Sequence, residues 1–197
     1  GDNHADLAFV YQAARDIAGA LDGFTVVCTK STVPVGTGDE IERLIREARP
    51  DAEVSVASNP EFLREGAAIE DFKRPDRIVI GVSDAQAREV MSELYAPLFI
   101  NQAPLMFTER RAAELIKYAA NAFLATKISF INELSVLCET VGGDVQAIAR
   151  VMGLDNRIGK KFLHAGPGYG GSCFPKDTLS AAHFARRLGH EFSIVEA

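Results

Sequence analysis

Apolar residues recur in two alternating patterns along the first half of the chain. Residues 6–21 place them on one face of a helix, and residues 24–30 then form a short β-branched run that is typical of a buried parallel strand. The same alternation predicts further helices at residues 38–48 and 85–98, and further strands at residues 54–58, 77–82 and 105–108. Strands that alternate with helices predict an α/β fold with a parallel sheet of about four strands.

The pattern changes after Thr108. Residues 109–141 contain no proline and no glycine and keep apolar residues at helical spacing, which predicts one helix of roughly 45 Å at 1.5 Å per residue. A helix of this length connects two lobes or forms a dimer interface. Gly142 and Gly143 end it, and Asp144 is placed to cap the helix that follows. We therefore expect two domains, residues 1–108 and residues 109–197.

Composition limits the classes of function. The chain has 197 residues, of which 47% are apolar, and a formal charge of −6, which argues against a general nucleic-acid binder. The sequence has no apolar run long enough to cross a membrane and no signal-peptide pattern. Cys28, Cys138 and Cys173 show neither metal-ligand spacing nor a disulfide framework, and the four histidines show no ligand spacing. We expect a cytoplasmic protein without a metal site, a nucleic-acid partner or a membrane partner.

One cysteine, Cys173, lies near the end of a glycine-rich segment, GPGYGGSCFPKD, at residues 166–177. Pro175 suits the first turn of a helix, and residues 178–188 have amphipathic helical spacing. A helix N-terminus and the charge of Lys176 both favour the nucleophilic thiolate, although a cysteine in an ordinary tight turn is the alternative. The glycines match G-x-G-x-x-G, but no strand-like run precedes them, so we reject a dinucleotide fingerprint here. Their amides could still approach a ligand.

Polar segments follow two of the predicted strands, at the edge where open α/β sheets bind ligands. KSTVPVG, at residues 30–36, offers the hydroxyls of Ser31 and Thr32, or forms a polar turn that ends at proline. NPEFLREG, at residues 59–66, holds Glu61 and Glu65, which share a face if the segment forms one helical turn. Two such carboxylates could polarise a water or orient a sugar hydroxyl, or could be ordinary exposed glutamates.

The long predicted helix carries two polar residues within a mainly apolar stretch. Lys117 and Asn121 are four residues apart and therefore share a face. They are either a surface pair that reaches solvent or polar groups that face a site.

Four motifs together carry a resemblance that none of them carries alone. STVPVG, NPEFLREG, ELIKYAANAFLATKISFINE and GPGYGGSCFPKD occur in the order and spacing of the nucleotide-sugar 6-dehydrogenases, the UDP-glucose/GDP-mannose dehydrogenase family. The resemblance covers essentially the whole chain. NPEFLREG with GGSCFPKD resembles the UDP-glucose branch, whereas the GDP-mannose branch tends to have leucine at the position of Phe174 and a different residue at Gly66. The implied fold is the second half of a Rossmann-like domain over residues 1–108, then a long helix and an all-helical central domain.

The resemblance implies a chemistry. The family oxidises the sugar C6 alcohol to a carboxylate and uses two molecules of NAD⁺. By resemblance, Cys173 is the nucleophile that passes through a thiohemiacetal and a thioester, and Lys117 stabilises the oxyanion. The other implied catalytic residues, which hold the reacting hydroxyl and water or act as a base, are Asn121, Asp177, Glu61 and Thr32.

The resemblance also implies two sets of binding residues. The side of the site that holds the nicotinamide would be lined by Ser31, Thr32, Val33, Glu65, Cys173, Phe174, Pro175 and Lys176. The UDP-sugar, with its diphosphate near the glycine amides, would be held by Glu61, Phe62, Leu63, Arg64, Glu65, Lys117, Asn121, Arg157, His164, Ala165, Gly166, Pro167, Gly168, Tyr169 and Gly170. The family often has a lysine at the position of His164.

The family pattern continues beyond this sequence at both ends. It begins with a strand and G-x-G-x-x-G and ends with a domain that closes over UDP, and neither occurs in these 197 residues. We expect a portion of a longer chain that is inactive alone, and a homodimer through the helical region. Two rival interpretations stay open: a 6-dehydrogenase of GDP-mannose or another nucleotide sugar, and a non-catalytic dimerisation module. A thiol hydrolase is a more distant third, because no His–Asp pair lies at a recognisable position.

Overall fold

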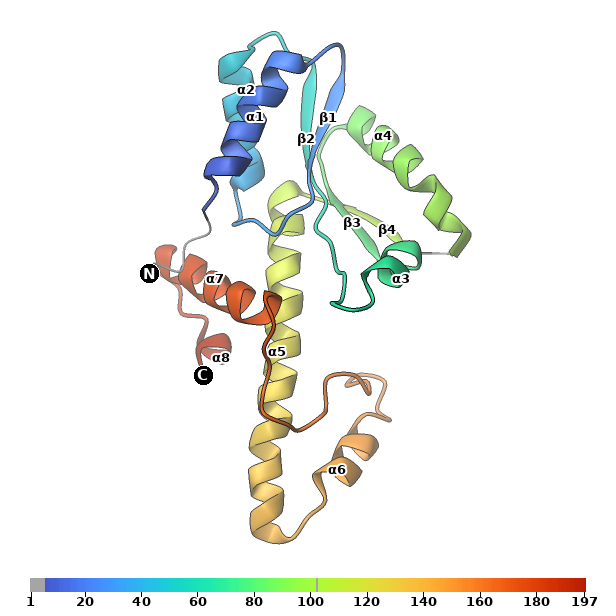
Figure 1. Cartoon of the computed structure of the whole chain (residues 1–197), viewed down its shortest axis with the longest axis vertical. Coiled ribbons are helices and arrows are strands. Elements are labelled where there is room, and N and C mark those ends of the chain that lie inside the picture. The colour runs from blue at the N-terminus through green and yellow to red at the C-terminus, as the bar shows by residue number, and fades with distance from the viewer. Residues whose placement is uncertain (1–5, 102) are drawn as a thin grey trace. The chain divides into compact units, whose positions relative to one another are not determined.

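The computed structural model describes residues 6–101 and 103–197 and divides into two compact units (Figure 1). The first unit ends at Lys117 and the second begins at Tyr118, so the boundary falls inside helix α5 (Arg110–Val141). The predicted helix at residues 109–141 therefore forms, and it contributes residues to both units. The domain division at residue 108 stays a prediction.

The first unit is a four-stranded sheet with helices on both faces. Its strands are β1 (Thr25–Thr29), β2 (Val54–Ser58), β3 (Ile78–Gly81) and β4 (Leu105–Thr108). Its helices are α1 (Ala8–Ala20), α2 (Thr37–Ala48), α3 (Ala68–Lys73), α4 (Ala85–Tyr95) and the 3₁₀ helix η1 (Ala96–Asn101). Each of the predicted strands forms within one or two residues of its expected bounds. The predicted helix at residues 85–98 changes to 3₁₀ geometry after Tyr95.

The α/β class is confirmed, but the sheet is not parallel throughout. The strand order is β1-β2-β3-β4; β1 and β2 are parallel, β3 and β4 are parallel, and β2 and β3 are antiparallel. A parallel connection requires a crossover that spans the sheet face, and α2 and α4, with 12 and 11 residues, provide it. Between β2 and β3 the chain forms only the six-residue α3, and it turns back instead.

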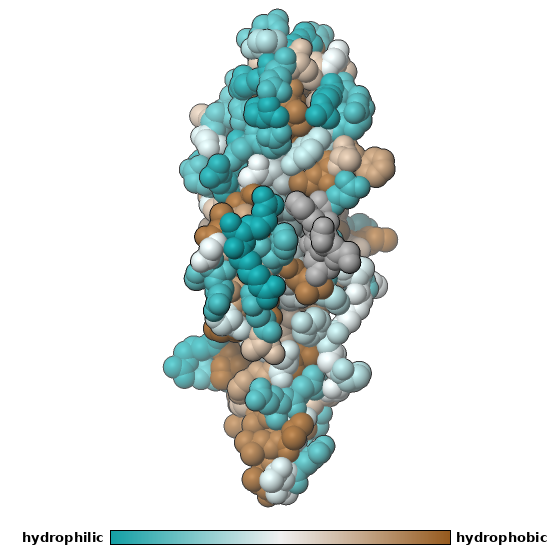
Figure 2. All heavy atoms as spheres, turned by 90° about the vertical axis from the view of Figure 1, so that its left-hand side faces the viewer, coloured by the Kyte–Doolittle hydropathy of each residue, from teal (hydrophilic) through white to brown (hydrophobic). Residues whose placement is uncertain are grey.

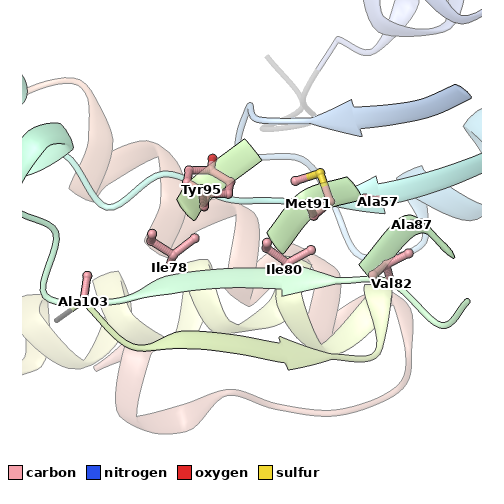
Figure 3. Close-up of a cluster of buried hydrophobic side chains, with 8 residues drawn as sticks. All are labelled: Ala57, Ile78, Ile80, Val82, Ala87, Met91, Tyr95 and Ala103. Atoms are coloured by element: carbon pink, nitrogen blue, oxygen red, sulfur yellow. The ribbon is translucent and has the colours of Figure 1, made fainter. Parts of the chain in front are cut away.

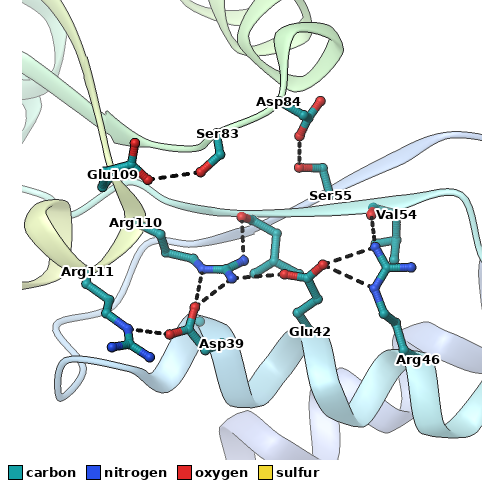
Figure 4. Close-up of polar contacts among 12 residues, drawn as sticks. Asp39, Glu42, Arg46, Val54, Ser55, Ser83, Asp84, Glu109, Arg110 and Arg111 are labelled. Atoms are coloured by element: carbon teal, nitrogen blue, oxygen red, sulfur yellow. Dashed lines mark hydrogen bonds and ion pairs between the residues drawn. The ribbon is translucent and has the colours of Figure 1, made fainter.

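The antiparallel pair is short, and arginines complete it. β2 and β3 share the single residue pair Ser58 and Gly81, so the first part of β2 lies away from β3. There, Arg46 Nη2 donates to the Val54 carbonyl at 3.2 Å, and Arg110 Nη1 donates to the Val56 carbonyl at 3.0 Å (Figure 4). Two guanidinium groups thus satisfy carbonyls that a neighbouring strand would otherwise bond.

Alternating side chains of the strands contribute to two separate hydrophobic cores, one on each face of the sheet. On one face, α1 and α2 pack in a cluster that contains Ala14, Ala18, Leu21, Ile41, Ile45, Val54 and Val56. On the other face, α4 covers a cluster that contains Ala57, Ile78, Ile80, Val82, Ala87, Met91, Tyr95 and Ala103 (Figure 3). Successive β2 residues contribute to opposite clusters because a strand turns alternate side chains to opposite faces.

The second unit consists of helices and loops. Besides the C-terminal part of α5, it contains α6 (Val145–Met152), α7 (Cys173–Arg187) and α8 (Ser193–Glu196). A small core of Ile131, Ala149 and Leu163 joins α5, α6 and the segment that follows α6. The expected cap is confirmed: Asp144 Oδ1 accepts a hydrogen bond from the Gln146 amide at 2.8 Å. Gly142, with φ of 74°, reverses the chain at the end of α5. Helix α7 begins at Cys173, with Pro175 in its first turn as predicted.

None of the helices in residues 6–101 and 103–197 is long and apolar enough to span a bilayer. The same residues contain no cluster of three or more His, Cys, Asp or Glu side chains that could hold a metal ion.

Candidate active site

The loops that follow β1 and β2 leave the sheet at one edge, because these strands are parallel and in register from Thr25–Val54 to Thr29–Ser58. A buried amide connects them. Asn59 Nδ2 donates to the Val79 carbonyl at 2.8 Å, and its Oδ1 accepts from Lys30 Nζ at 3.0 Å and from the Tyr95 hydroxyl. Although Lys30 is exposed as a whole, desolvation of its ammonium lowers the pKa of Lys30, against the opposing charges of Cys28 and Glu61. Asn59 thus fixes both loops at their starting points.

The loop after β1 presents hydroxyls at one end and is anchored at the other. Ser31 is exposed, Thr32 is half-buried and Val33 is buried. At the far end, the Gly36 amide donates to Glu114 Oε2 at 2.6 Å, and the Gly38 amide donates to Glu114 Oε1 at 2.8 Å. The anchor therefore leaves Ser31 and Thr32 as the polar groups that a ligand can reach.

Lys117 and Glu61 form an ion pair beside the loop after β2. Lys117 Nζ lies 3.3 Å from Glu61 Oε1, and Lys117 is 4% exposed. Its ammonium also lies 5.5 Å from the centroid of the Phe62 ring, and the Arg77 guanidinium lies 4.0 Å from the same centroid. The burial of Lys117 excludes the interpretation of this residue as a surface lysine, and its role in a site stays a prediction.

Residues 61–65 do not form the helical turn on which a shared face of Glu61 and Glu65 depended. The segment has no helix, because two of its backbone amides donate hydrogen bonds to side-chain carboxylates. The Leu63 amide donates to Glu61 Oε2 at 2.6 Å, and the Arg64 amide donates to Asp71 Oδ2 at 2.8 Å. Glu61 and Glu65 therefore do not share a helical face. Leu63, Arg64 and Glu65 are exposed, and the guanidinium of Arg64 is held by Asp71 in a two-pronged ion pair.

In the second unit, Asn121 and Asp177 make a buried hydrogen bond. Asn121 Nδ2 donates to Asp177 Oδ2 at 2.6 Å, and the two residues are 8% and 1% exposed. The other oxygen, Asp177 Oδ1, is buried and accepts no hydrogen bond from any residue that the structure describes; Lys176 Nζ lies 3.8 Å away. A desolvated carboxylate oxygen without a donor can bind a hydroxyl or water that enters beside it.

Cys173 lies one turn before Asp177 on α7. It is half-buried, and its Sγ is 3.7 Å from the hydroxyl of Ser172. Since residues four apart on a helix share a face, the thiol and the buried carboxylate face the same way. The first turn of α7 thus carries a thiol, the ring of Pro175 and the exposed ammonium of Lys176.

The glycine-rich segment before α7 is held at two points. The Gly166 amide donates to Asn132 Oδ1 of α5 at 2.8 Å. At the other end, the Phe174 ring makes edge-to-face contacts with Tyr169 and Phe162, both with centroids 6.0 Å apart. Phe162 adopts a left-handed backbone with φ of 64°, a strained conformation for an aromatic residue that tertiary packing must hold.

Other predicted substrate residues in the second unit are exposed. His164, Gly166, Pro167, Gly168, Tyr169 and Gly170 are exposed, and Ala165 is half-buried. Arg157 is also exposed, and Asp155 holds its guanidinium in an ion pair at 2.6 Å. The loop can therefore present backbone amides to a ligand.

Sequence reasoning missed several residues that hold these groups in position. They are Asn59, Asp71, Arg77, Glu114 and Asn132. Two of them left a signal: Asn59 opens the NPEFLREG motif, and Glu114 lies three residues before Lys117 on the same helix.

A cavity of about 460 Å³ lies elsewhere in the first unit. Its lining includes Phe24 and Val54, at the amino-terminal ends of β1 and β2, together with Glu42, Arg46 and Arg110. No residue of its lining belongs to the predicted site. The cavity is therefore separate from the loops described above.

Comparison with known proteins supplies the family. Residues 1–99 match the NAD binding domain of the UDP-glucose/GDP-mannose dehydrogenase family, and residues 111–197 match its central domain. The chain is 72% identical over 198 residues to a UDP-glucose 6-dehydrogenase of Rhizobium meliloti (strain 1021), covering 100% of this chain and 45% of that protein. It is 54% identical to a UDP-glucose 6-dehydrogenase of Bacillus subtilis (strain 168), covering 100% of this chain and 44% of that protein.

Solved structures of dehydrogenases match the fold of this chain. The structure of a UDP-glucose dehydrogenase from Pyrobaculum islandicum matches with a TM-score of 0.93 and 46% identity, covering 99% of this chain and 45% of that one. A GDP-mannose dehydrogenase from Pseudomonas aeruginosa matches with a TM-score of 0.72 and 31% identity, covering 97% and 45%. The chain thus spans less than half the length of these relatives. With both domain matches in sequence order and over nearly all its residues, the chain belongs to the UDP-glucose/GDP-mannose dehydrogenase family.

Proposed function

We propose that the protein carrying this chain is an NAD-dependent dehydrogenase that oxidises UDP-glucose at C6 to UDP-glucuronate. The observation that carries the proposal is the first turn of α7, where Cys173 precedes a buried carboxylate, and one oxygen of that carboxylate, Asp177 Oδ1, accepts no hydrogen bond from the described residues. A nucleophilic thiol beside a group that can hold a hydroxyl or water suits an oxidation that passes through a thioester. The 72% identity to a UDP-glucose 6-dehydrogenase supports UDP-glucose as the sugar nucleotide.

The described residues fit one part of NAD. The exposed Ser31 and half-buried Thr32, at the carboxyl end of β1, suit a polar nicotinamide amide, with Val33 and Glu65 as further lining within the same unit. The N-terminus of α2 does not suit the diphosphate, because Glu114 already accepts its amides. When bound, NAD⁺ supplies the hydride acceptor.

The reaction balances as two oxidations and one hydrolysis. In the first, the C6 hydroxyl loses a proton and C6 loses a hydride, which gives the aldehyde. The Cys173 thiolate then forms a bond to C6, and the resulting oxyanion is stabilised by the Lys117 ammonium and takes up a proton to give the thiohemiacetal. Loss of that hydroxyl proton with a second hydride leaves a thioester, and water cleaves its C–S bond to release the carboxylate and regenerate the thiol.

The remaining side chains hold and move protons in this scheme. Asn121 orients Asp177 through their hydrogen bond, so that Asp177 Oδ1 accepts from the reacting hydroxyl or water. Glu61, held by Lys117, acts as the base for hydrolysis, and Thr32 belongs to the same proton network. The exposed segment from His164 to Gly170, together with Phe62, Leu63, Arg64 and Arg157, would hold the sugar nucleotide.

The second unit also supports a homodimer. Exposed apolar side chains gather on the C-terminal half of α5 and around α6, and Figure 2 shows brown spheres at that end. They include Phe130, Val136, Leu137, Val141, Val151 and Leu154. An exposed apolar patch of this kind favours burial against a second copy. This patch also favours the rival interpretation of a non-catalytic dimerisation module, which the assay below separates. The cytoplasmic location stays a prediction.

The test is the number of NADH molecules formed per sugar nucleotide consumed by the full-length protein, over a panel of UDP- and GDP-sugars. We expect two NADH per UDP-glucose and loss of turnover in Cys173→Ala, while the control Cys28→Ala retains it. If two NADH form only with GDP-mannose, the substrate is GDP-mannose and not UDP-glucose. No NADH with any sugar would overturn the proposal in favour of the dimerisation module. The same assay of the 197 residues alone checks the prediction that they are inactive.

A further inference from the structure

Glu114 is a buried carboxylate for which the proposed reaction has no use. It is 3% exposed and lies in the second turn of α5, yet both of its oxygens accept hydrogen bonds from the start of α2. The donors are the amides of Gly36 and Gly38, at 2.6 and 2.8 Å. The first amides of a helix have no partner within the helix, so Glu114 supplies a cap from a distant segment.

The two glycines of the VGTG segment, residues 35–38, make this cap possible. Gly36 has φ of 94°, a left-handed conformation that other residues rarely adopt. At Gly38, a Cβ atom would lie 2.5 Å from Arg110 Cδ and 3.1 Å from Glu114 Oε1, so a larger residue would force the Arg110 side chain to move and would crowd the carboxylate. Both glycines therefore serve the close approach of Glu114 to the backbone.

The turn before the cap is rigid. Thr37 is buried, and its hydroxyl and its amide both donate to the Pro34 carbonyl, at 2.6 and 3.1 Å. Val33, which precedes the turn, is 3% exposed. A displacement of Gly36 therefore moves the chain back to Val33, and with it Ser31 and Thr32.

The same helix also holds the loop after β2. Lys117, three residues after Glu114, makes the ion pair with Glu61 at 3.3 Å. Residues three apart on a helix lie on neighbouring positions of one face. A single turn of α5 thus fixes one loop through a carboxylate and the other through an ammonium.

We propose that Glu114 is a positioning residue for the cofactor: it holds the Val33–Gly38 turn so that Ser31 and Thr32 keep a fixed register with Lys117 and Glu61. The inference rests on the proposed function, because it assigns Ser31 and Thr32 to the nicotinamide. Glu114 acts through the loop and does not itself touch a reacting atom.

The charged groups around Glu114 are consistent with a fixed carboxylate. Burial is the largest cause and leaves the pKa of Glu114 raised above its ordinary value; Asp39 of α2 also raises the pKa, while the Gly36 and Gly38 amides and Arg110 of α5 lower it. Tyr11 of α1 also faces this region, because the charges of Glu40 and Glu114 add to the burial that raises the pKa of Tyr11. The hydrogen bonds from the Gly36 and Gly38 amides stabilise the negative charge of Glu114 more than the Arg110 cation does.

The test compares Glu114→Gln with the control Glu109→Gln in the full-length protein. Glu109 is an exposed carboxylate just before α5 that accepts from Ser83 at 3.1 Å. An amide cannot accept from both glycines, since one of its ends is a donor. For Glu114→Gln we expect hydrogen exchange at Gly36 and Gly38 to accelerate at least about tenfold and the KM for NAD⁺ to rise about tenfold. The KM for UDP-glucose should change less than about twofold, and Glu109→Gln should match the wild type.

Each other outcome decides against the inference or identifies what failed. Faster exchange with an unchanged KM for NAD⁺, or an equal rise in both KM values, would show a purely structural cap and overturn it. If Glu114→Gln does not fold, Glu114→Asp, which keeps the charge but shortens the reach, is measured in the same way. If the wild type oxidises no sugar nucleotide, the proposed function fails; an NAD⁺ dissociation constant equal in wild type and Glu114→Gln would then overturn this inference separately.

Discussion

Lys117 Nζ lies 3.3 Å from Glu61 Oε1, and the lysine is almost completely buried while the glutamate is about one-third exposed. The asymmetry matters, because the ammonium has lost most of its water and depends on this carboxylate and on the Phe62 ring for compensation. Glu61 in turn is placed by the Leu63 amide, which donates to its second oxygen. The pair is therefore a fixed cation with a partly accessible carboxylate, which suits a group that stabilises developing negative charge.

Replacement of Lys117 by methionine should abolish most turnover and leave the fold intact. The buried stem keeps its packing, but the cation that would stabilise the oxyanion is lost, and we expect kcat to fall about 10²–10³-fold. Lys73→Met, on the exposed end of α3, is the matched control and should retain activity. Steady-state kinetics of both variants provide the measurement, and a Lys117→Met enzyme with more than about a tenth of the wild-type kcat would contradict the assigned role.

The three cysteines should react with iodoacetamide at different rates. Cys173 is half-buried in the first turn of α7 and should react first, whereas Cys138 is 3% exposed and should react last. Burial raises the pKa of Cys28, although Lys30 opposes it. A raised pKa means that less thiolate is present at neutral pH, so labelling of Cys28 should lag at pH 7 and accelerate as the pH rises toward 9.

Peptide mass spectrometry of a labelling time course at pH 7, 8 and 9 measures all three rates together. Equal and slow labelling of the three thiols at pH 7 would contradict the prediction, and it would favour the dimerisation module over the enzyme.

The sequence predicted elements better than it predicted their directions. The strands followed from short β-branched runs, and α5 followed from 33 residues (109–141) without glycine or proline. The antiparallel direction of β3 could not be predicted, because it depends on how residues 59–77 fold. There, the Arg64–Asp71 ion pair and the hydrogen bond from the Leu63 amide to Glu61 hold a non-helical segment, so the condition for a shared face of Glu61 and Glu65 is not met.

The site shows the same limit. The motifs proposed Cys173, Lys117, Asn121 and Asp177 as site residues, while periodicity left Lys117 and Asn121 open between surface and site. Burial excludes the exposed surface pair, and the roles in the site stay predictions. Glu114 was missed because its two partner amides are 78 and 76 residues away in the chain. A contact of that separation leaves no local pattern, whereas a cap such as Asp144 lies two residues from its partner.

Arg110 and Arg111 bind the same carboxylate and should differ strongly in their effect on stability. Arg110 is 18% exposed and donates to Asp39, Glu42 and the Val56 carbonyl, while Arg111 is 71% exposed and, among the described residues, binds only Asp39 (Figure 4). Arg110→Met leaves partly buried acceptors without a donor, and we expect the free energy of unfolding to fall by about 2–4 kcal/mol. Arg111→Met should cost at most about 1 kcal/mol.

Urea denaturation at several pH values measures this difference. Burial alone would raise the pKa of Asp39, but the hydrogen bonds from Arg111 and Arg110 outweigh it and lower the pKa. A lowered pKa in the folded state contributes stability that is present above the unfolded value of about 3.9 and is lost as the pH falls through the folded value. The deficit of Arg110→Met should therefore be largest near neutral pH and shrink below about pH 4. An equal deficit in both variants would contradict the assignment.

Two glycine-to-alanine substitutions should change stability in opposite directions. At Gly81, the last residue of β3, a Cβ would lie 2.6 Å from Ala113 Cβ and 2.7 Å from Arg110 Cα. These atoms belong to the first turns of α5 and have no flexible end that can yield, so Gly81→Ala should lower the free energy of unfolding by about 1–3 kcal/mol. Gly19 lies inside α1, where no described atom comes within 4 Å of an added Cβ, and Gly19→Ala should raise it by about 0.5–1 kcal/mol. Urea midpoints of the two variants decide the matter: a Gly81→Ala midpoint at or above the wild-type value would show that the start of α5, and with it the placement of Glu114 and Lys117, is not fixed by contact with β3.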